Sequence, residues 1–333
     1  MSIHNASARP TRRRVLQGAM AAAALLHPGR RAAAAVYPER PVRVVVPFAP
    51  GGPVDVFGRL LADKLSTRLG QQFFIENHGG AGGNIGTGRA AKAAPDGYTL
   101  LLNANNHVIN PLLYATVPYD PFKDFVPISL AVTFPTAVMV NPSLSLHSVA
   151  DLVAFVRANP KKYGFASAGI GTPSHLLAER MRQKLNLDLV HVPYNGSGPT
   201  AQAVMAGDTP IGFAGLTAAA PLAKAGRLTI VAIMSKERAQ GMPDVPSIAE
   251  AGYPELAGEA WDAMFAPTGT PPTIVARLAD EVGKIVRLPD IGARLETLGL
   301  TPIGTPTDAF ARQLTAESAV WAEVIRAAGL KLK

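Results

Sequence analysis

Four glycine-rich corners contain the residues of this sequence whose types and spacing could do chemistry. Each places a short loop of glycine, proline and small polar residues between an apolar run and a stretch of helical period. Glycine lets the main chain approach a ligand closely, and the first turn of a helix offers unpaired N–H groups at the positive end of its dipole. Such corners suit anions. They read PFAPGGPVDVFGRLL (47–61), ENHGGAGGNIGTG (76–88), SAGIGTPSHLL (167–177) and VPYNGSGPTAQ (192–202).

Phosphate is the first anion to consider, because nucleotide-binding loops share this layout. No corner has the lysine that a P-loop requires, and the strict G-x-G-x-x-G pattern is absent from the glycine run at 79–88. A relaxed form occurs at Gly196, Gly198 and Ala201, but Pro199 interrupts it and no acidic residue follows about 20 positions later. Nucleotide binding is therefore disfavoured.

Catalytic patterns are scarce. The sequence has no H-E-x-x-H, no G-x-S-x-G elbow and no His and carboxylate cluster at metal-ligand spacing. It has no cysteine, which excludes thiol nucleophiles and zinc–thiolate sites. Ser174 and His175 are adjacent at a helix start and point in different directions, so they are not expected to act as a nucleophile and its base. We expect Ser174 to cap the helix and His175 to be a polar residue in the wall of the site. We predict binding with no catalytic residue, metal or cofactor. The alternative is a periplasmic enzyme with His175 or Asp55 as base.

The positive charge of the chain lies mostly in its first 35 residues. Of the formal +8 of the 333 residues, six charges come from arginines in that stretch, which has no acid, so +2 remains for the rest. Nucleic-acid binding is therefore not predicted. The order TRRRVLQGAMAAAALL followed by small residues predicts a signal peptide over 1–35, cleaved near Ala35. It resembles a twin-arginine export signal, with an ordinary Sec signal as the alternative. A periplasmic protein is expected.

The elements that must position the corners follow an α/β pattern with largely parallel strands. Ser148 and Asp151 have capping-box spacing and predict a helix that runs to about Asn159. Further helices are expected from about Ser174, Thr200 and Thr217, and over 272–287, 289–298 and 307–328. Strands are expected at 42–46, 73–76, 98–102, 163–167, 189–192, 211–213 and 228–233. Two such α/β groups predict two lobes with a cleft.

The ordered set of motifs resembles the solute receptors of the tripartite tricarboxylate transporter system, the Bug family of periplasmic binding proteins. The matching segments include VVVPFAPGGPVDVFGRLL, IENHGGAGGNIGTG, ASAGIGTPSHLLAE, VPYNGSGP and FAPTGTPPTIVARL, in family order over nearly all of 37–333.

The resemblance implies a type II periplasmic binding protein: two α/β lobes with mixed sheets, joined by two crossing strands around a ligand cleft. Lobe 1 would comprise 37–138 plus 262–333 and lobe 2 would comprise 139–261, with crossings near 126–140 and 259–266. It implies capture of a small carboxylate for delivery to an integral-membrane permease. Its ligand-binding positions map here to Phe48, Ala49, Gly51, Gly52, Asp55, Gly80, Ala81, Gly82, Gly171, Thr172, Ser174, His175, Tyr194 and Asn195.

Several of these residues keep two interpretations. Phe48 faces either the ligand or the underside of its loop, and Asp55 either complements the helix dipole or contacts a cationic group of the cargo. Asn105, with Asn103, Asn106 and His107, either supplies donors to the cleft floor or forms a polar loop. A monomer is expected. A receptor that serves a sensor instead of a permease would need the same site.

No corner has an arginine or lysine in its loop or in the first turn of the helix that follows, so no such side chain there would pair with the anion. A hydrogen bond to a charged group contributes roughly 1.5–3 kcal/mol, and micromolar affinity requires about 8 kcal/mol. Four or five main-chain and hydroxyl donors are therefore sufficient.

Overall fold

The computed structural model describes residues 37–48, 50–51, 53–239 and 241–331. The predicted signal peptide and the predicted site residues Ala49 and Gly52 lie outside these residues. The strands are β1 Val42–Val46, β2 Phe73–Asn77, β3 Thr99–Ala104, β4 Phe125–Phe134, β5 Thr136–Val140, β6 Gly164–Ser167, β7 Val190–Pro193, β8 Ile211–Gly215, β9 Thr229–Ile233, β10 Ala260–Pro267 and β11 Thr301–Thr305.

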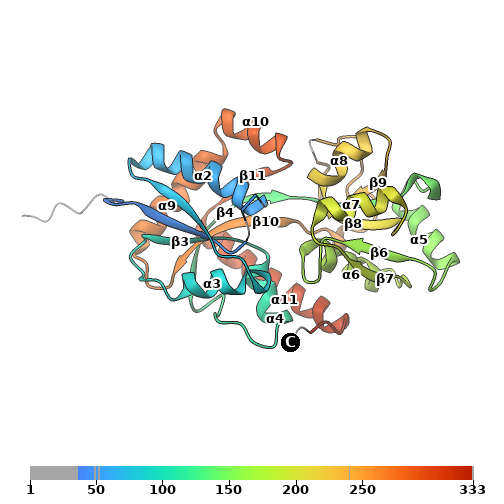
Figure 1. Cartoon of the computed structure of the whole chain (residues 1–333), viewed down its shortest axis with the longest axis horizontal. Helices are drawn as coiled ribbons and strands as arrows, with labels where there is room; N and C mark the ends of the chain where they lie inside the picture. Colours follow the sequence, from blue (N-terminus) through green and yellow to red (C-terminus); the bar gives the residue numbers. More distant parts are fainter. Residues whose placement is uncertain (1–36, 49, 52, 240, 332–333) are drawn as a thin grey trace, which may run out of the picture. The chain divides into compact units, whose positions relative to one another are not determined.

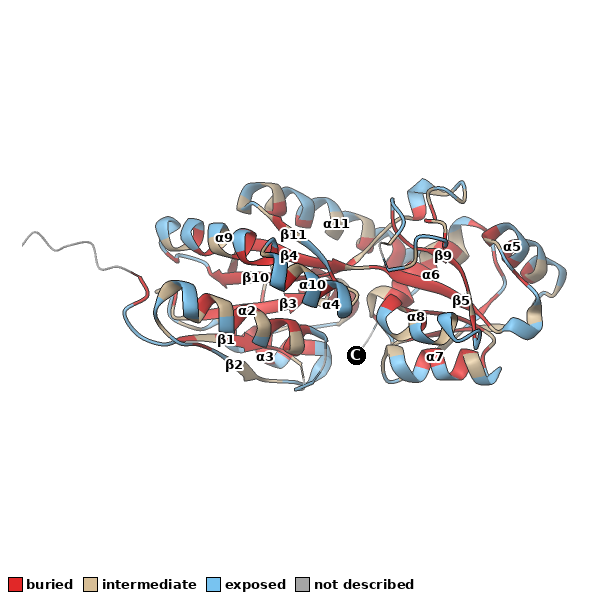
Figure 2. Ribbon diagram, turned by 90° about the horizontal axis from the view of Figure 1, so that it is seen from above, coloured by how far each residue is buried: buried red, intermediate tan, exposed pale blue. Residues whose placement is uncertain are grey.

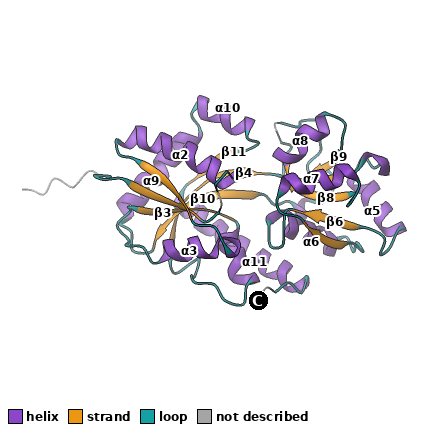
Figure 3. Ribbon diagram, viewed as in Figure 1, coloured by secondary structure: helices purple, strands orange, loops and turns teal. Residues whose placement is uncertain are grey.

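The helices alternate with these strands along the chain (Figure 3). They are α2 Pro53–Leu69, α3 Asn84–Ala91, α4 Asn106–Leu113, α5 Val149–Ala158, α6 Pro173–Lys184, α7 Ser197–Ala206, α8 Leu216–Lys224, α9 Pro272–Val286, α10 Pro289–Thr297 and α11 Thr307–Ala327. No helix among the described residues is both long enough and apolar enough to cross a bilayer.

The first sheet has six strands in the order β11-β4-β10-β3-β1-β2. Strands β1, β2 and β3 are parallel, whereas β10 runs antiparallel to both β3 and β4. Alternate residues face opposite layers: Leu101 and Phe265 belong to a cluster with residues of α3, α4 and α11. Leu102 faces α2, where only glycine at position 58 leaves it room. The sheet is therefore covered on both faces (Figure 1).

The second sheet has five strands in the order β7-β6-β8-β5-β9, with β6 parallel to β7 and β8, and β5 antiparallel to β8 and β9. Its strands also bury both faces. Val138 and Val140 pack in the cluster that includes α5 and α6 residues, whereas Ala137 and Met139 pack in a smaller cluster with α7 and α8. Figure 2 shows the buried strands between exposed outer helix surfaces.

The chain passes between the two sheets at two places. Strand β4 of the first sheet is separated from β5 of the second by Pro135 alone, and the chain re-enters the first sheet at β10. Residues 40–333 form one compact unit.

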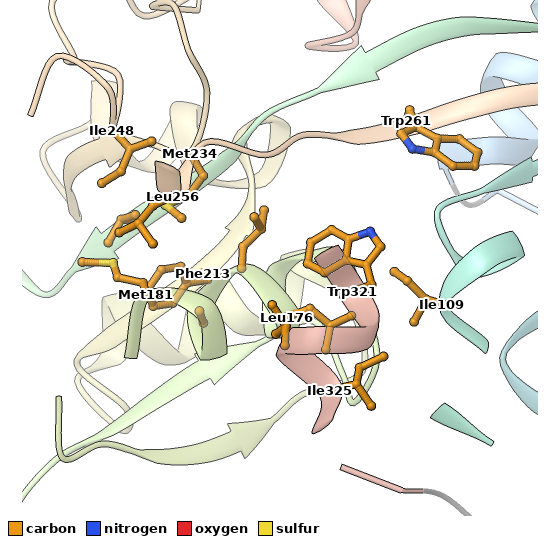
Figure 4. Packing of buried hydrophobic residues seen from close by; sticks show 14 of the residues in the cluster. Ile109, Leu176, Met181, Phe213, Met234, Ile248, Leu256, Trp261, Trp321 and Ile325 are labelled. Carbon is orange, nitrogen blue, oxygen red and sulfur yellow. The ribbon is translucent and has the colours of Figure 1, made fainter. Parts of the chain in front are cut away.

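One apolar cluster connects the helices of the two sheets. Trp321 of α11 lies between Leu176 of α6 and Ile109 of α4 (Figure 4), and all three side chains are buried. Because buried apolar area is the main source of folding free energy, α11 fixes α4 and α6 near one another.

Most predicted elements are confirmed to within a few residues, and Ser148 caps α5 by accepting a hydrogen bond from the Asp151 N–H at 3.0 Å. Two differences remain. Of the two interpretations of the polar stretch after β3, the loop is wrong, because α4 begins at Asn106. Strand β11, which pairs with β4 and lies between two of the predicted C-terminal helices, was not predicted.

Candidate functional site

The first corner joins β1 to α2 and is organised by Asp55. The Asp55 carboxylate is 2% exposed and accepts four hydrogen bonds: from the Gly51 N–H (2.8 Å), from the Arg59 Nε and Nη2 (3.0 and 2.9 Å) and from the Asn77 Nδ2 (2.9 Å). Burial raises the pKa of Asp55, but the bonds from Arg59, Gly51 and Asn77 outweigh it and lower the pKa. Asp55 therefore holds the corner, and its acceptor positions are filled.

Replacing Asp55 by Ala is expected to weaken ligand binding at least tenfold, because the Gly51 corner and Arg59 lose their shared partner. The loss of hydrogen bonds to a buried charge should also lower the free energy of unfolding by about 2 kcal/mol. Isothermal titration and urea unfolding measure the two effects. Asp63→Ala, an exposed residue of the same helix, is the matched control; equal effects in both variants would contradict this role of Asp55.

The second corner, between β2 and α3, has four successive residues in the left-handed region: Gly80, Ala81, Gly82 and Gly83, with φ of 125°, 48°, 65° and 98°. Ala81 pays a conformational penalty there that glycine avoids. Gly80, Ala81 and Gly82 are exposed, so their main chain is open to a ligand. The Phe48 ring lies 3.4 Å from where a Cβ on Gly83 would be, which brings the first two corners together.

The third corner, between β6 and α6, is held by its own side chains. Thr172 Oγ1 caps α6 by accepting a hydrogen bond from the His175 N–H (3.4 Å), and it donates to the Gly169 carbonyl at 2.7 Å. The Ser174 hydroxyl accepts from the Ala168 N–H at 3.2 Å. The hydroxyls of Thr172 and Ser174 are thus already engaged, although each keeps further capacity to bond.

His175 lies beneath this corner and is fully buried. Its Nδ1 accepts a hydrogen bond from the Gly171 N–H at 3.1 Å, and its ring stacks on His191 at 3.8 Å between centroids. Burial lowers the pKa of His175 to about 3 and that of His191 to about 4, with the His191 charge contributing to the shift of His175. A neutral, inaccessible imidazole supports the corner and is poorly placed to act as a base.

The fourth corner, between β7 and α7, lies against the third. The Gly196 N–H donates to the Ala168 carbonyl at 3.1 Å, and Gly196 has φ of 113°. The Tyr194 hydroxyl bonds Thr209 Oγ1 at 3.0 Å, and its ring packs against the smaller cluster of the second sheet. Asn195 is exposed. The Tyr194 ring therefore forms a wall of the corner and its hydroxyl already has a hydrogen-bond partner, whereas Asn195 is exposed to solvent.

The two pairs of corners approach one another at the end of α4. A Cβ on Gly171 would lie 2.3 Å from Leu113 Cδ2, and a Cβ on Gly82 would lie 2.7 Å from the Tyr114 hydroxyl. The C-cap residue of α4, Tyr114, therefore packs on the second corner, and the last residue of the helix, Leu113, packs on the third. The side chain of Asn110 adds a hydrogen bond to the Gly82 carbonyl at 2.8 Å. Sequence reasoning missed Asn110, Leu113 and Tyr114.

Asn105 is buried and fully bonded on the face of the sheet covered by α11. Its Nδ2 donates to Glu317 Oε1 at 2.6 Å and to the Glu259 carbonyl at 3.4 Å, and its Oδ1 accepts from the Trp261 N–H at 2.9 Å. Asn103 bonds Thr87, and His107 faces the Pro121 carbonyl. These side chains position the start of α4.

The site therefore consists of glycine main chain, helix starts and neutral hydroxyls. No cluster of three or more His, Asp or Glu side chains suited to a metal is present in the part of the chain described. The arrangement can hold an anion by hydrogen bonds and helix dipoles.

Three solved structures have the same fold. The chain is similar to the periplasmic binding protein BugD (TM-score 0.75, 32% identity, 89% of this chain and 100% of that one). It is similar to an R. palustris protein with adipate (TM-score 0.78, 34% identity, 89% and 99%) and to MatC from Rhodopseudomonas palustris with bound malate (TM-score 0.74, 33% identity, 87% and 100%). The fold is that of two-lobed periplasmic binding proteins.

The family model described as "Tripartite tricarboxylate transporter family receptor" matches residues 57–330. The match includes three of the four corners and α4, the elements that meet in the candidate site. The chain belongs to the tripartite tricarboxylate transporter receptor family.

Proposed function

We propose that this protein is a periplasmic receptor that binds a small carboxylate at the four corners and performs no chemistry on it. The observation that carries the proposal is the meeting of the exposed Gly80–Gly82 main chain and the Gly171 corner at Leu113 and Tyr114. A carboxylate there would receive donors from both pairs of corners, and the adipate and malate bound by similar proteins support this ligand class.

The lobes that would enclose the ligand are 37–138 plus 262–333 and 139–261. Strand pairing supports this division, because the first sheet takes its strands from 42–134 and 260–305 and the second from 136–233. A ligand bonded to both lobes favours the closed arrangement by its higher affinity for it.

The proposal includes delivery to an integral-membrane permease, export to the periplasm by the twin-arginine-type signal over 1–35, and a monomeric state. The family assignment supports the permease and the compartment. The sequence TRRRVL at 11–16 supports the signal.

Isothermal titration of the purified protein with adipate and malate, together with a panel of other di- and tricarboxylates, tests the proposal. We expect at least one to bind with micromolar affinity and to be recovered unchanged by mass spectrometry after prolonged incubation. Failure of every carboxylate in the panel to bind, or conversion of a bound one, would overturn the proposed function.

A further inference from the structure

A cavity of about 630 Å³ lies apart from the four corners, on the face of the first sheet that α11 covers. Its walls come from β4, β10, β11, α6, α11 and the segments 236–237 and 257–259, and no residue of the corners lines it. Its volume falls in the range of about 300–1,000 Å³ that is usual for small-molecule sites. The proposed function does not use this cavity.

One wall of the cavity carries positive charge. Arg180 of α6 is partly buried and donates to the Ala257 carbonyl at 3.4 Å, and no described carboxylate forms an ion pair with it. Burial lowers the pKa of Arg180, against the attraction of Glu255 and Glu323. Lys236 is exposed at the rim of the same cavity. Since a partly desolvated guanidinium without a carboxylate partner is costly, this wall favours an anionic group.

The side of the cavity next to β10 carries an acidic group, Glu259. Burial raises the pKa of Glu259, and that carboxyl forms no ion pair with a described cation. The Thr133 hydroxyl is near enough to lower this pKa in part, and Glu237 and Lys236 act on it in opposite directions. Arg180 and Glu259 thus line one cavity without pairing with each other.

A buried hydroxyl without a partner also lines the cavity. Thr133 is 7% exposed, and its Oγ1 makes no hydrogen bond of acceptable geometry, even to Glu259. Buried polar atoms without a hydrogen bond are uncommon and destabilising, so a ligand group that bonds to this hydroxyl would be favoured.

The rest of the lining is mixed. Trp321, Val320 and Ile303 supply its apolar part, and Glu237, Thr301 and Gln313 add polar side chains. Glu317 also lines it, but its carboxylate already accepts hydrogen bonds from Trp261 Nε1 (2.8 Å), Trp321 Nε1 (2.8 Å) and Asn105. Glu317 therefore holds the indoles in place and is not available to a ligand.

We propose that this cavity is a second binding site, which takes a small amphoteric molecule with a carboxylate, an ammonium group and an apolar body. The carboxylate lies against Arg180 and Lys236, the ammonium group against Glu259 with the Thr133 hydroxyl beside it, and the apolar body against Trp321. Such a ligand contacts α6, which packs on the second sheet, and also β10 and α11 on the side of the first sheet. It lies next to the hydrogen bond between Glu317 and Asn105 that positions α4.

Equilibrium binding to the full mature protein tests this site with three probes: L-leucine, L-phenylalanine and 6-aminohexanoate. We expect at least one to bind, and its analogues lacking the amine or the carboxylate to bind at least tenfold more weakly. Arg180→Met, Lys236→Met and Glu259→Gln should each weaken the probe at least tenfold. Lys236 is exposed, so its variant tests the site without risk to folding. Arg227→Met, an exposed arginine outside the cavity, should leave binding unchanged.

A corner variant separates the two sites. Gly171→Ala should weaken dicarboxylate binding and leave binding of the amphoteric probe unchanged. The second site is overturned if none of the three probes binds at millimolar concentration, or if Gly171→Ala abolishes probe binding while the cavity variants retain it. Neither result would contradict carboxylate capture at the corners, which the titrations with adipate and malate measure separately.

Discussion

Gly171→Ala is expected to weaken carboxylate binding about 100-fold or more. The added Cβ would lie 2.3 Å from Leu113 Cδ2, and Gly171 has φ of 76°, which a residue with a side chain adopts at a cost of about 1 kcal/mol. Leu113 is 1% exposed and has little room to withdraw. The variant therefore displaces the Gly171 corner from α4, and loss of two main-chain hydrogen bonds to a charged ligand corresponds to about 3 kcal/mol or more.

Gly226→Ala is the matched control for this prediction. Gly226 has φ of 68°, so the backbone penalty is similar, but nothing lies within 4 Å of its added Cβ. Titration with the preferred carboxylate should show near-normal affinity for Gly226→Ala, and urea unfolding should show a smaller loss of stability for it than for Gly171→Ala, because only the Cβ at position 171 meets a buried side chain. Retention of affinity within threefold by Gly171→Ala would show that the corner does not form the site.

Asp262→Asn is expected to stabilise the protein increasingly as pH rises. Asp262 lies on β10 between Ala104 of β3 and Val132 of β4, is fully buried, and neither carboxylate oxygen has a hydrogen-bond partner. Burial alone raises its pKa from 3.8 to about 8.

The sign of the pH dependence follows from this raised pKa. Between pH 4 and 8 the folded protein keeps a proton on Asp262 that the unfolded chain has released, so this group lowers stability by about 1.4 kcal/mol per pH unit as pH rises. Asparagine cannot ionise and removes that slope. The advantage of Asp262→Asn over the parent should therefore grow by about 4 kcal/mol between pH 5 and 8.

Urea unfolding at pH 5, 6, 7 and 8 measures the difference between the two proteins at each pH. The exposed Asp308→Asn serves as control for loss of a negative charge. A constant difference between parent and Asp262→Asn across this range would mean that Asp262 is ionised in the folded protein.

Sequence periodicity located the elements whose local pattern agrees with their final environment. Four of the five residues of Val42–Val46 are valines, all buried because both faces of the strand are covered, and the predicted bounds are those of β1. Thr301–Thr305 has one strongly apolar side chain, a proline and a glycine, so nothing local indicates a strand; pairing with β4 creates it. Helix α4 begins with Asn106 and His107 and contains Pro111, all unfavourable to a helix, and packing against α11 stabilises it.

The candidate site was predictable where glycine conformation defines it. The left-handed conformations of Gly80, Gly82, Gly83 and Gly171 follow from corners that glycine tolerates well, whereas that of Ala81 has no such signal in the sequence. The contribution of Leu113 could not be read from the sequence, because a leucine at helical spacing looks like any core residue. Asn105 was included among the predicted ligand donors. Its hydrogen bond to Glu317 could not be foreseen, because 212 residues separate the two in the chain.

The position of β10 determines when the first sheet can be completed. Among the described strands, this one alone is hydrogen-bonded to both β3 and β4, and it thereby connects the β1–β3 half of the sheet to the β4–β11 half. Until the ribosome has released residue 267, the nascent chain carries strands β1–β3 with one open edge and a β4 that lacks both of its neighbours, whereas all strands of the second sheet precede residue 234. Unpaired edges recruit other strands, so the unfinished chain is most prone to aggregation after β4 has been synthesised and before β10 is released.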